Sequence, residues 1–176
     1  MIKQAIIPLA GLGTRLLPLT SIFAKELLPI NGKPGIEYIL DECVDAGIKK
    51  IIFIISKKKQ LIKKYFYNDS FYKKIIKTKK DKRIKYEYEK IKKFKKMIKF
   101  VYQNKPLGTG DAVLKTKKFI KHNFFLMLLP DDLIIKRNCS KSMIKIHEKY
   151  NTSVMASMNV RKKNVSRWGI YKLKKK

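Results

Sequence analysis

Short apolar runs alternate along this chain with longer segments in which apolar residues recur at helical spacing. The runs predict buried strands at 5–9, 51–55, 98–102, 124–129, 153–160 and 170–173. The periodic segments between them predict helices at about 34–47, 57–66, 110–119 and 140–150. This alternation predicts an α/β layered fold with a mostly parallel sheet.

Residues 67–96 interrupt the alternation. They are rich in lysine and only weakly periodic, which predicts helices on the surface rather than elements of the core. At 176 residues the chain is long enough for one domain with a sizeable core. We therefore interpret this stretch as a helical insertion within a single domain.

A glycine-containing loop follows the first apolar run. It reads Ala10-Gly11-Leu12-Gly13, and Thr14 and Arg15 come directly after it. Glycines let a backbone approach an anion closely and point N–H groups at it. Arg15 and, further on, Lys25 add positive charge. This combination predicts a ligand rich in phosphate.

Two familiar phosphate-binding motifs do not fit this loop or its surroundings. The dinucleotide fingerprint needs a third glycine where this chain has Leu16. The P-loop needs serine or threonine after Gly-Lys, but Gly32-Lys33 is followed by Pro34. The glycine loop is therefore of another kind.

Two more candidate site segments follow predicted strands. Gln103 precedes Gly108 and Gly110, and a glutamine side chain offers both a donor and an acceptor to a base edge. Asp131 follows the apolar run 124–129, at the end of a strand where α/β sheets bind ligands. A carboxylate there, together with phosphate oxygens, suits Mg²⁺, which is a hard ion.

These motifs resemble those of the sugar-1-phosphate nucleotidyltransferase family, and most of all its UTP–glucose branch. The family carries Ala-Gly-Leu-Gly-Thr-Arg-x-Leu-Pro-x-Thr, found here from Ala10 to Thr20, and then Lys-Glu-x-Leu-Pro, found from Lys25 to Pro29. A helical insertion that opens like the segment 66–71 is typical of the same branch. This chain departs from the family at Ser21 and Ala24, where lysine and proline are usual.

The resemblance implies a Rossmann-like three-layer fold and a Mg²⁺-dependent reaction. A uridylyl group would pass from UTP to glucose 1-phosphate, giving UDP-glucose and pyrophosphate. Two alternatives stay open within the class, namely thymidylyl transfer and uridylyl transfer to N-acetylglucosamine 1-phosphate. Outside the class, a non-catalytic nucleotide-binding remnant and a polyanion-binding protein also stay open.

The resemblance also implies roles for particular residues. Arg15 and Lys25 would be catalytic and hold the phosphates, and Asp131 would bind the magnesium ion. Trp168-Gly169-Ile170-Tyr171 is similar to a Tyr-Gly-Val-Val segment of the family, which makes Gly169 a candidate for sugar binding. The nucleotide-binding residues would be Ala10, Gly11, Leu12, Gly13, Gln103, Gly108 and Gly110. Position 111 is often histidine in the family and is aspartate here.

Members of the family continue beyond the segment matched here. The continuation carries a Glu-Lys-Pro segment that grips the sugar phosphate and a second aspartate for the metal ion. Residues 1–176 contain no Glu-Lys-Pro. We therefore expect an enzyme that is truncated at its C-terminus, with impaired activity when the chain is alone.

The composition adds a large positive charge but no clear nucleic-acid signature. The formal net charge is +30, yet only 5 of the 43 basic residues are arginines, the residue that nucleic-acid readers favour. Lysine is instead spread along the chain together with isoleucine, phenylalanine, tyrosine and asparagine, residues that share A/T-rich codons. We expect no specific nucleic-acid partner.

Cellular location and assembly are only weakly indicated by the sequence. No apolar run approaches the roughly eighteen residues of a membrane span, and no signal peptide is visible. Cys43 and Cys139 are isolated and have no metal-like spacing, as expected of small buried residues in a reducing cytoplasm. Assembly into a homo-oligomer is compatible with the sequence.

Overall fold

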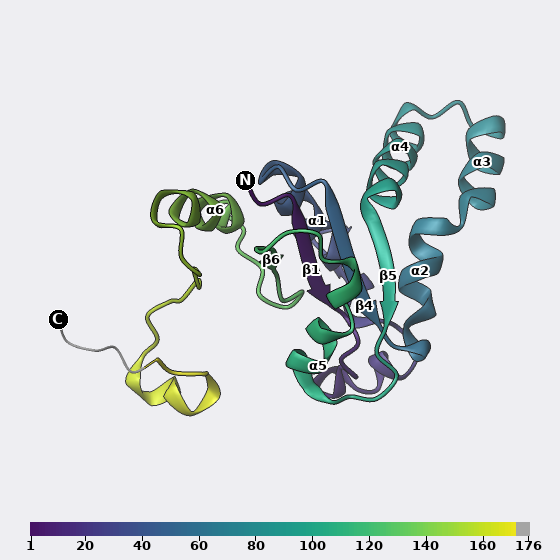
Figure 1. Ribbon diagram of the computed structural model, residues 1–176. Helices are drawn as coiled ribbons and strands as arrows, with labels where there is room; N and C mark the ends of the chain where they lie inside the picture. Colours follow the sequence, from purple (N-terminus) through teal and green to yellow (C-terminus); the bar gives the residue numbers. More distant parts are fainter. Residues whose placement is uncertain (172–176) are drawn as a thin grey trace.

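A parallel sheet with helices on both faces organises the molecule (Figure 1). The computed structural model describes residues 1–171. Four strands lie in the spatial order β5-β4-β1-β6, and every neighbouring pair is parallel. Their bounds are β1 Gln4–Pro8, β4 Lys50–Ile55, β5 Ile98–Tyr102 and β6 Leu126–Met127. The predicted α/β layered fold with a mostly parallel sheet is confirmed.

A separate two-stranded hairpin lies outside this sheet. It consists of β2 Pro29–Ile30 and β3 Lys33–Pro34, which are antiparallel. Asn31 and Gly32 both have positive φ angles, of 49° and 74°, as a two-residue hairpin turn requires. The hairpin leads directly into the first helix.

Within residues 1–171, six α-helices cover the sheet and extend beyond it. They are α1 Gly35–Asp45, α2 Gln60–Tyr67, α3 Asp69–Thr78, α4 Lys82–Met97, α5 Gly108–Leu114 and α6 Cys139–Tyr150. Short 3₁₀ helices lie in the connections: η1 Thr14–Leu16, η2 Leu19–Ser21, η3 Lys25–Leu27, η4 Lys57–Lys59, η5 Lys117–Phe119 and η6 Lys162–Arg167. None of the helices in residues 1–171 combines the length and apolarity needed to cross a membrane.

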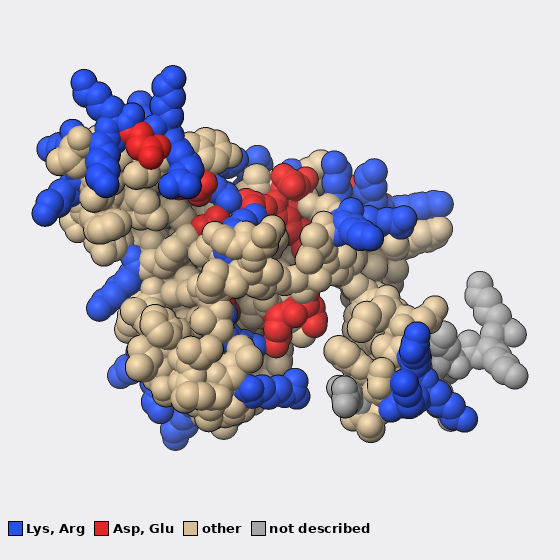
Figure 2. Space-filling view, turned by 180° about the vertical axis from the view of Figure 1, so that it is seen from behind, with Lys and Arg blue, Asp and Glu red and all other residues tan. Residues whose placement is uncertain are grey.

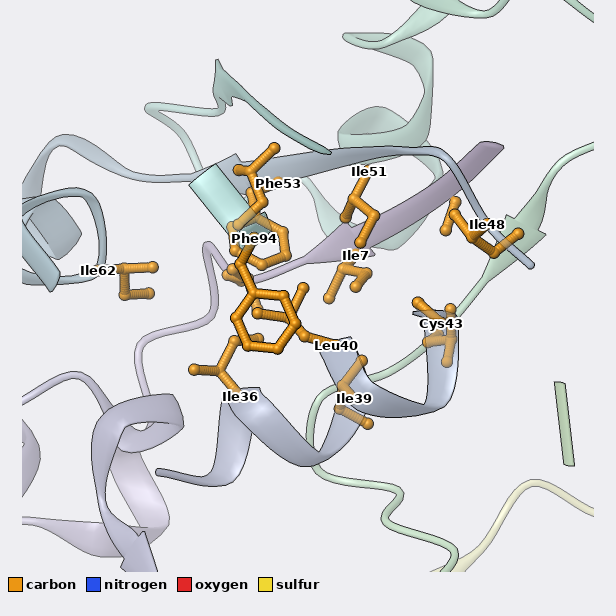
Figure 3. Packing of buried hydrophobic residues seen from close by; sticks show 14 of the residues in the cluster. Ile7, Ile36, Ile39, Leu40, Cys43, Ile48, Ile51, Phe53, Ile62 and Phe94 are labelled. Atoms are coloured by element: carbon orange, nitrogen blue, oxygen red, sulfur yellow. The ribbon is translucent and has the colours of Figure 1, made fainter. Parts of the chain in front are cut away.

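The main core lies between one face of the sheet and helices α1, α2 and α4 (Figure 3). Alternate strand residues such as Ile7 and Phe53 point to this face, because successive side chains of a strand face opposite ways. The ring of Phe53 packs against Phe66 of α2 and Phe100 of β5, with centroids 5.8 and 5.7 Å apart. Ile6 and Ile54 face the other way, where Ala112 of α5 covers them. Both faces of β4 are buried, which explains why Ile51–Ile55 is continuously apolar.

The stretch 67–96 contains the helices α3 and α4, and the prediction that its helices lie outside the core is wrong for α4, whose Ile91 and Phe94 are part of the main core. An aspartate at the start of α4, Asp81, accepts hydrogen bonds from the N–H groups of Arg83 and Ile84, at 2.7 and 3.3 Å. One stripe of α4 is buried and attaches the pair to the core; it consists of Tyr88, Ile91 and Phe94. The outer surface carries a dense cover of basic side chains (Figure 2).

Several predicted elements differ from the structure. The prediction of a strand at 153–160 is wrong, since a strand needs a partner for its backbone groups and this segment pairs with none of the described strands. The strand predicted at 124–129 is reduced to the two residues of β6, and its strong apolarity does not place it at the centre of the sheet, since β6 stands last in the strand order. The predicted helix at 110–119 is divided into α5 and η5. Of the strand predicted at 170–173, residues 170 and 171 are not in a strand and the rest lies outside the described residues.

Candidate functional site

The four parallel strands end at one edge of the sheet, and the segments after them form the candidate site. Three backbone hydrogen bonds carry the strand pairing into these segments. Leu9 N–H donates to the Ile54 carbonyl at 2.7 Å, Gln103 to Ile55 at 2.9 Å, and Leu128 to Ile6 at 3.1 Å. As a result, the glycine loop, the Gln103 segment and the Asp131 segment all begin at the same edge, where open α/β sheets bind ligands.

Gly13 fixes the shape of the first loop. Its φ angle is +70°, a conformation that residues with side chains rarely adopt. A Cβ at this position would also lie 3.1 Å from Cγ2 of Thr20. The hydroxyl of Thr20 donates to the Gly13 carbonyl at 2.9 Å and closes the loop. Thr20 was not singled out from the sequence, although it is the last residue of the first motif.

The rest of the loop is open to an incoming ligand. Nothing lies within 4 Å of the place where a Cβ on Gly11 would be. Leu12 is 54% exposed and Arg15 is exposed, whereas Ala10 is half-buried. The loop therefore presents exposed backbone next to the exposed side chain of Arg15.

Lys25 and Asp131 meet across this edge. The Lys25 ammonium donates to Oδ2 of Asp131 at 2.8 Å, joining η3 to the segment after β6. Partial burial raises the pKa of Asp131, but the hydrogen bond and charge of Lys25, aided by Arg15, outweigh it and lower the pKa overall. Asp131 is thus an anion here, and its side chain is 63% exposed and accessible from solvent.

A second and deeper ion pair lies beside the first. The Lys59 ammonium donates to both carboxylate oxygens of Glu26, at 2.6 and 2.8 Å. The side chains of Lys59 and Glu26 are only 9% and 1% exposed. Burial lowers the pKa of Lys59, although Glu26 opposes this effect. Lys59 was missed from the sequence because it ends the run Lys57–Lys59, and such runs usually lie in solvent.

Gln103 is held in place by its own segment. Its side-chain NH₂ donates to the Gly108 carbonyl at 3.0 Å and to Oδ2 of Asp111 at 2.8 Å. The bond from Gln103 lowers the pKa of Asp111 against a smaller opposing effect of burial. Gly108 has a φ angle of +90°, and the positions of Cβ atoms on Gly108 and Gly110 have nothing within 4 Å. The segment therefore combines a fixed amide with open backbone.

Gly169 is not brought to this edge of the sheet. It lies just after η6, in the yellow segment that Figure 1 shows apart from the ends of β1, β4 and β5. A cavity of about 530 Å³ lies between β6, α6 and residues 153–156, and none of the predicted site residues lines it. The structure thus gathers the predicted phosphate, base and metal residues but leaves the predicted sugar residue elsewhere.

The candidate site contains one carboxylate that suits a magnesium ion. Asp131 supplies a hard, exposed carboxylate beside Arg15 and Lys25, which attract phosphate. No group of three or more His, Cys, Asp or Glu side chains in residues 1–171 is arranged to hold a metal ion. The residues fit a Mg²⁺ ion that takes most of its ligands from a bound triphosphate and water, with one from the protein.

Residues 4–176 match the family model described as nucleotidyl transferase. The chain belongs to this family.

Comparison with individual proteins shows which members of the family this chain is most similar to among those compared. A protein of Methanocaldococcus jannaschii is 40% identical over 173 residues, which are 97% of this chain and 59% of that protein. The UTP–glucose-1-phosphate uridylyltransferase of Mycoplasma pneumoniae is 37% identical over 96% of this chain and 58% of its own length. The solved UTP-bound UGPase of Acinetobacter baumannii is 35% identical with a TM-score of 0.77, covering 86% of this chain and 54% of that one. The chain thus spans less than two thirds of these relatives.

Proposed function

We propose that this chain binds UTP and serves the transfer of its uridylyl group to glucose 1-phosphate, yielding UDP-glucose and pyrophosphate. The observation that carries the proposal is the meeting of Lys25 and Asp131 beside an open glycine loop, at the ligand-binding edge of the sheet. The named activity of the Mycoplasma relative and the UTP bound to the Acinetobacter enzyme support the choice of nucleotide and sugar.

The phosphates of UTP would lie against the glycine loop. Gly11 and Gly13 leave room for them, with Ala10 and Leu12 contributing backbone, and Arg15 would hold the departing pyrophosphate. Lys25 would turn from Asp131 to the phosphates when a metal ion takes up that carboxylate. The sugar phosphate then attacks the α-phosphorus in line, and no covalent enzyme intermediate is required.

Magnesium is the metal ion we propose for this reaction, with Asp131 as its protein ligand. When bound there, the ion would reduce the negative charge of the phosphate under attack. We place the reaction in the cytoplasm, where the free thiols Cys43 and Cys139 stay reduced.

Gln103 would read the uracil base. Both hydrogens of its NH₂ group are directed by Gly108 and Asp111, which leaves Oε1 to accept a hydrogen bond from the ring N3–H of uracil. Adenine has no such donor on its ring. Gly108 and Gly110 would let the ribose approach the backbone, and Gly169 stays a candidate for the sugar.

Titration calorimetry of the purified chain tests the proposal. We expect UTP to bind in the presence of Mg²⁺, ATP to bind more weakly, and UDP-glucose to bind more tightly than UDP-N-acetylglucosamine. Release of pyrophosphate from UTP on addition of glucose 1-phosphate reports the reaction. Equal affinity for UTP and ATP would contradict the assignment of the base, and tighter binding of dTTP than UTP would favour thymidylyl transfer.

A further inference from the structure

The buried pair formed by Glu26 and Lys59 joins two of the segments that build the site. Glu26 lies in η3, after the glycine loop, and Lys59 ends η4, after β4. The ammonium contacts both oxygens of the carboxylate, and both side chains are almost fully withdrawn from water. The pair is therefore a fixed connection between η3 and η4.

Stability alone is a weak reason for such a pair. Removing two charges from water costs free energy that their mutual attraction offsets only when the geometry is good. An apolar pair of similar volume is often as stable or more stable, so a buried ion pair is better explained by the position that it specifies. In this protein, the ion pair specifies the position of η3 relative to η4.

Lys25 is the neighbour of Glu26 in the single turn of η3. The turn is closed by hydrogen bonds from Leu27 N–H to the Ala24 carbonyl at 2.9 Å and from Leu28 N–H to the Lys25 carbonyl at 3.2 Å. A turn of three residues behaves as one unit, so fixing the Glu26 carboxylate also fixes the direction in which Lys25 leaves the backbone.

Charge makes the arrangement more specific. Lys59 lies close to Lys25 and Asp131. The charge of Lys25 lowers the pKa of Lys59, and the charge of Asp131 raises it. Glu26 engages Lys59 with both oxygens, so that Lys59 does not compete with Lys25 for Asp131 or for a phosphate. Loss of Glu26 would leave an unpaired ammonium beside the site.

We propose that the Glu26–Lys59 ion pair positions Lys25 for the phosphates of the nucleotide, so that Glu26 and Lys59 are positioning residues of the site. The inference rests on the proposed function, since it assigns Lys25 to the phosphates. It predicts that the ion pair affects UTP affinity by positioning Lys25, so that its effect is lost when Lys25 is replaced.

A double-mutant cycle tests the inference. Lys59→Met should weaken Mg²⁺–UTP binding about tenfold in calorimetry, within the range of coupling between residues in contact. In a chain that already carries Lys25→Met, the same substitution should change the affinity by less than about twofold. Equal losses in both backgrounds would overturn the inference.

A second variant separates position from stability. Glu26→Leu combined with Lys59→Met replaces the ion pair by two apolar side chains and leaves no unpaired buried polar group, so urea unfolding should show a stability close to that of the wild type. Its UTP affinity should nevertheless stay about tenfold below the wild-type value. Wild-type affinity in this double variant would overturn the inference.

Lys90 supplies the matched control. It pairs with the buried Glu37 at 2.7 Å, but between α4 and α1 rather than at the site. Lys90→Met should alter the unfolding free energy and leave UTP affinity unchanged. A wild-type chain that binds no UTP would overturn the proposed function and this inference together, whereas UTP binding that Lys59→Met does not weaken would overturn this inference alone.

Discussion

The ammonium group of Lys25 lies 2.8 Å from the carboxylate of Asp131, although 106 residues separate the two in sequence. One residue belongs to η3, after the glycine loop, and the other follows β6. The contact connects η3 with the segment after β6 at the C-terminal edge of the sheet. It also places a cation that can hold phosphate beside an anion that can hold a metal ion.

Replacing Asp131 should remove the dependence of nucleotide binding on magnesium. Asp131→Asn keeps the shape of the side chain but lacks the charge that a hard cation needs. We expect the gain in UTP affinity on adding Mg²⁺ to fall about tenfold, as for loss of one charge-assisted interaction. Asp132→Asn is the control, because its side chain lies next in the chain and should leave the gain intact. Calorimetry with and without Mg²⁺ decides between them.

Base recognition is tested at Gln103. Gln103→Ala removes an amide whose direction is fixed by Gly108 and Asp111, so we expect UTP affinity to fall about tenfold while ATP affinity stays the same. Gln60→Ala is the matched control, since the Gln60 side chain donates to the Tyr102 hydroxyl at 3.4 Å in an exposed position. A uniform loss for both nucleotides would show that Gln103 supports the segment rather than the base.

Cys43 should be chemically inert in the folded protein. Burial, with a smaller contribution from Glu42, raises the pKa of its thiol from 9.0 to about 12. At pH 8 only about one thiol in ten thousand is then the reactive thiolate. We expect iodoacetamide to label Cys43 only in urea and the half-buried Cys139 faster, as mass spectrometry of peptides would show.

The same pKa shift has a consequence for stability. An acid with a raised pKa in the folded state ionises first in the unfolded chain, so unfolding becomes easier as pH rises from about 9 towards 12. Cys43→Ser should flatten this part of the pH dependence of the unfolding free energy. An equal slope in both proteins would contradict the assignment.

The core should be far less tolerant of truncation than the insertion. Phe53 is fully buried between two aromatic rings, and Phe53→Ala should lower the free energy of unfolding by about 3–5 kcal/mol. Phe71 of α3 is 63% exposed, and Phe71→Ala should change it by no more than about 0.5 kcal/mol. Urea unfolding followed by circular dichroism measures both.

The basic surface should bind nucleic acid only weakly and without regard to sequence. A charge of +30 carried mostly by lysine attracts phosphates without reading bases. We expect binding to duplex DNA to weaken steeply with added salt and to be the same for shuffled sequences. Tight binding to one sequence at physiological salt would restore the interpretation as a nucleic-acid reader.

The class of fold and most residues of the candidate site can be predicted from local sequence. Continuous apolar runs such as 51–55 suit strands that are buried on both faces, and glycines at 11 and 13, followed by Arg15 and Lys25, predict an anion-binding loop. These signals are local, so a single stretch of chain contains all the information needed to recognise them. The parallel sheet, the helical insertion and the shared edge follow from them.

The pairing of charged residues, in contrast, depends on the three-dimensional arrangement of distant segments. In the sequence, Lys59 belongs to a run of lysines, which predicts a solvated side chain. The fold instead places it against Glu26, 33 positions away, in a buried environment. In the same way, apolar content at 153–160 predicted a strand, but pairing depends on a neighbouring strand that local sequence does not specify. Burial and pairing are properties of distant segments brought together, and the pattern of one segment does not contain them.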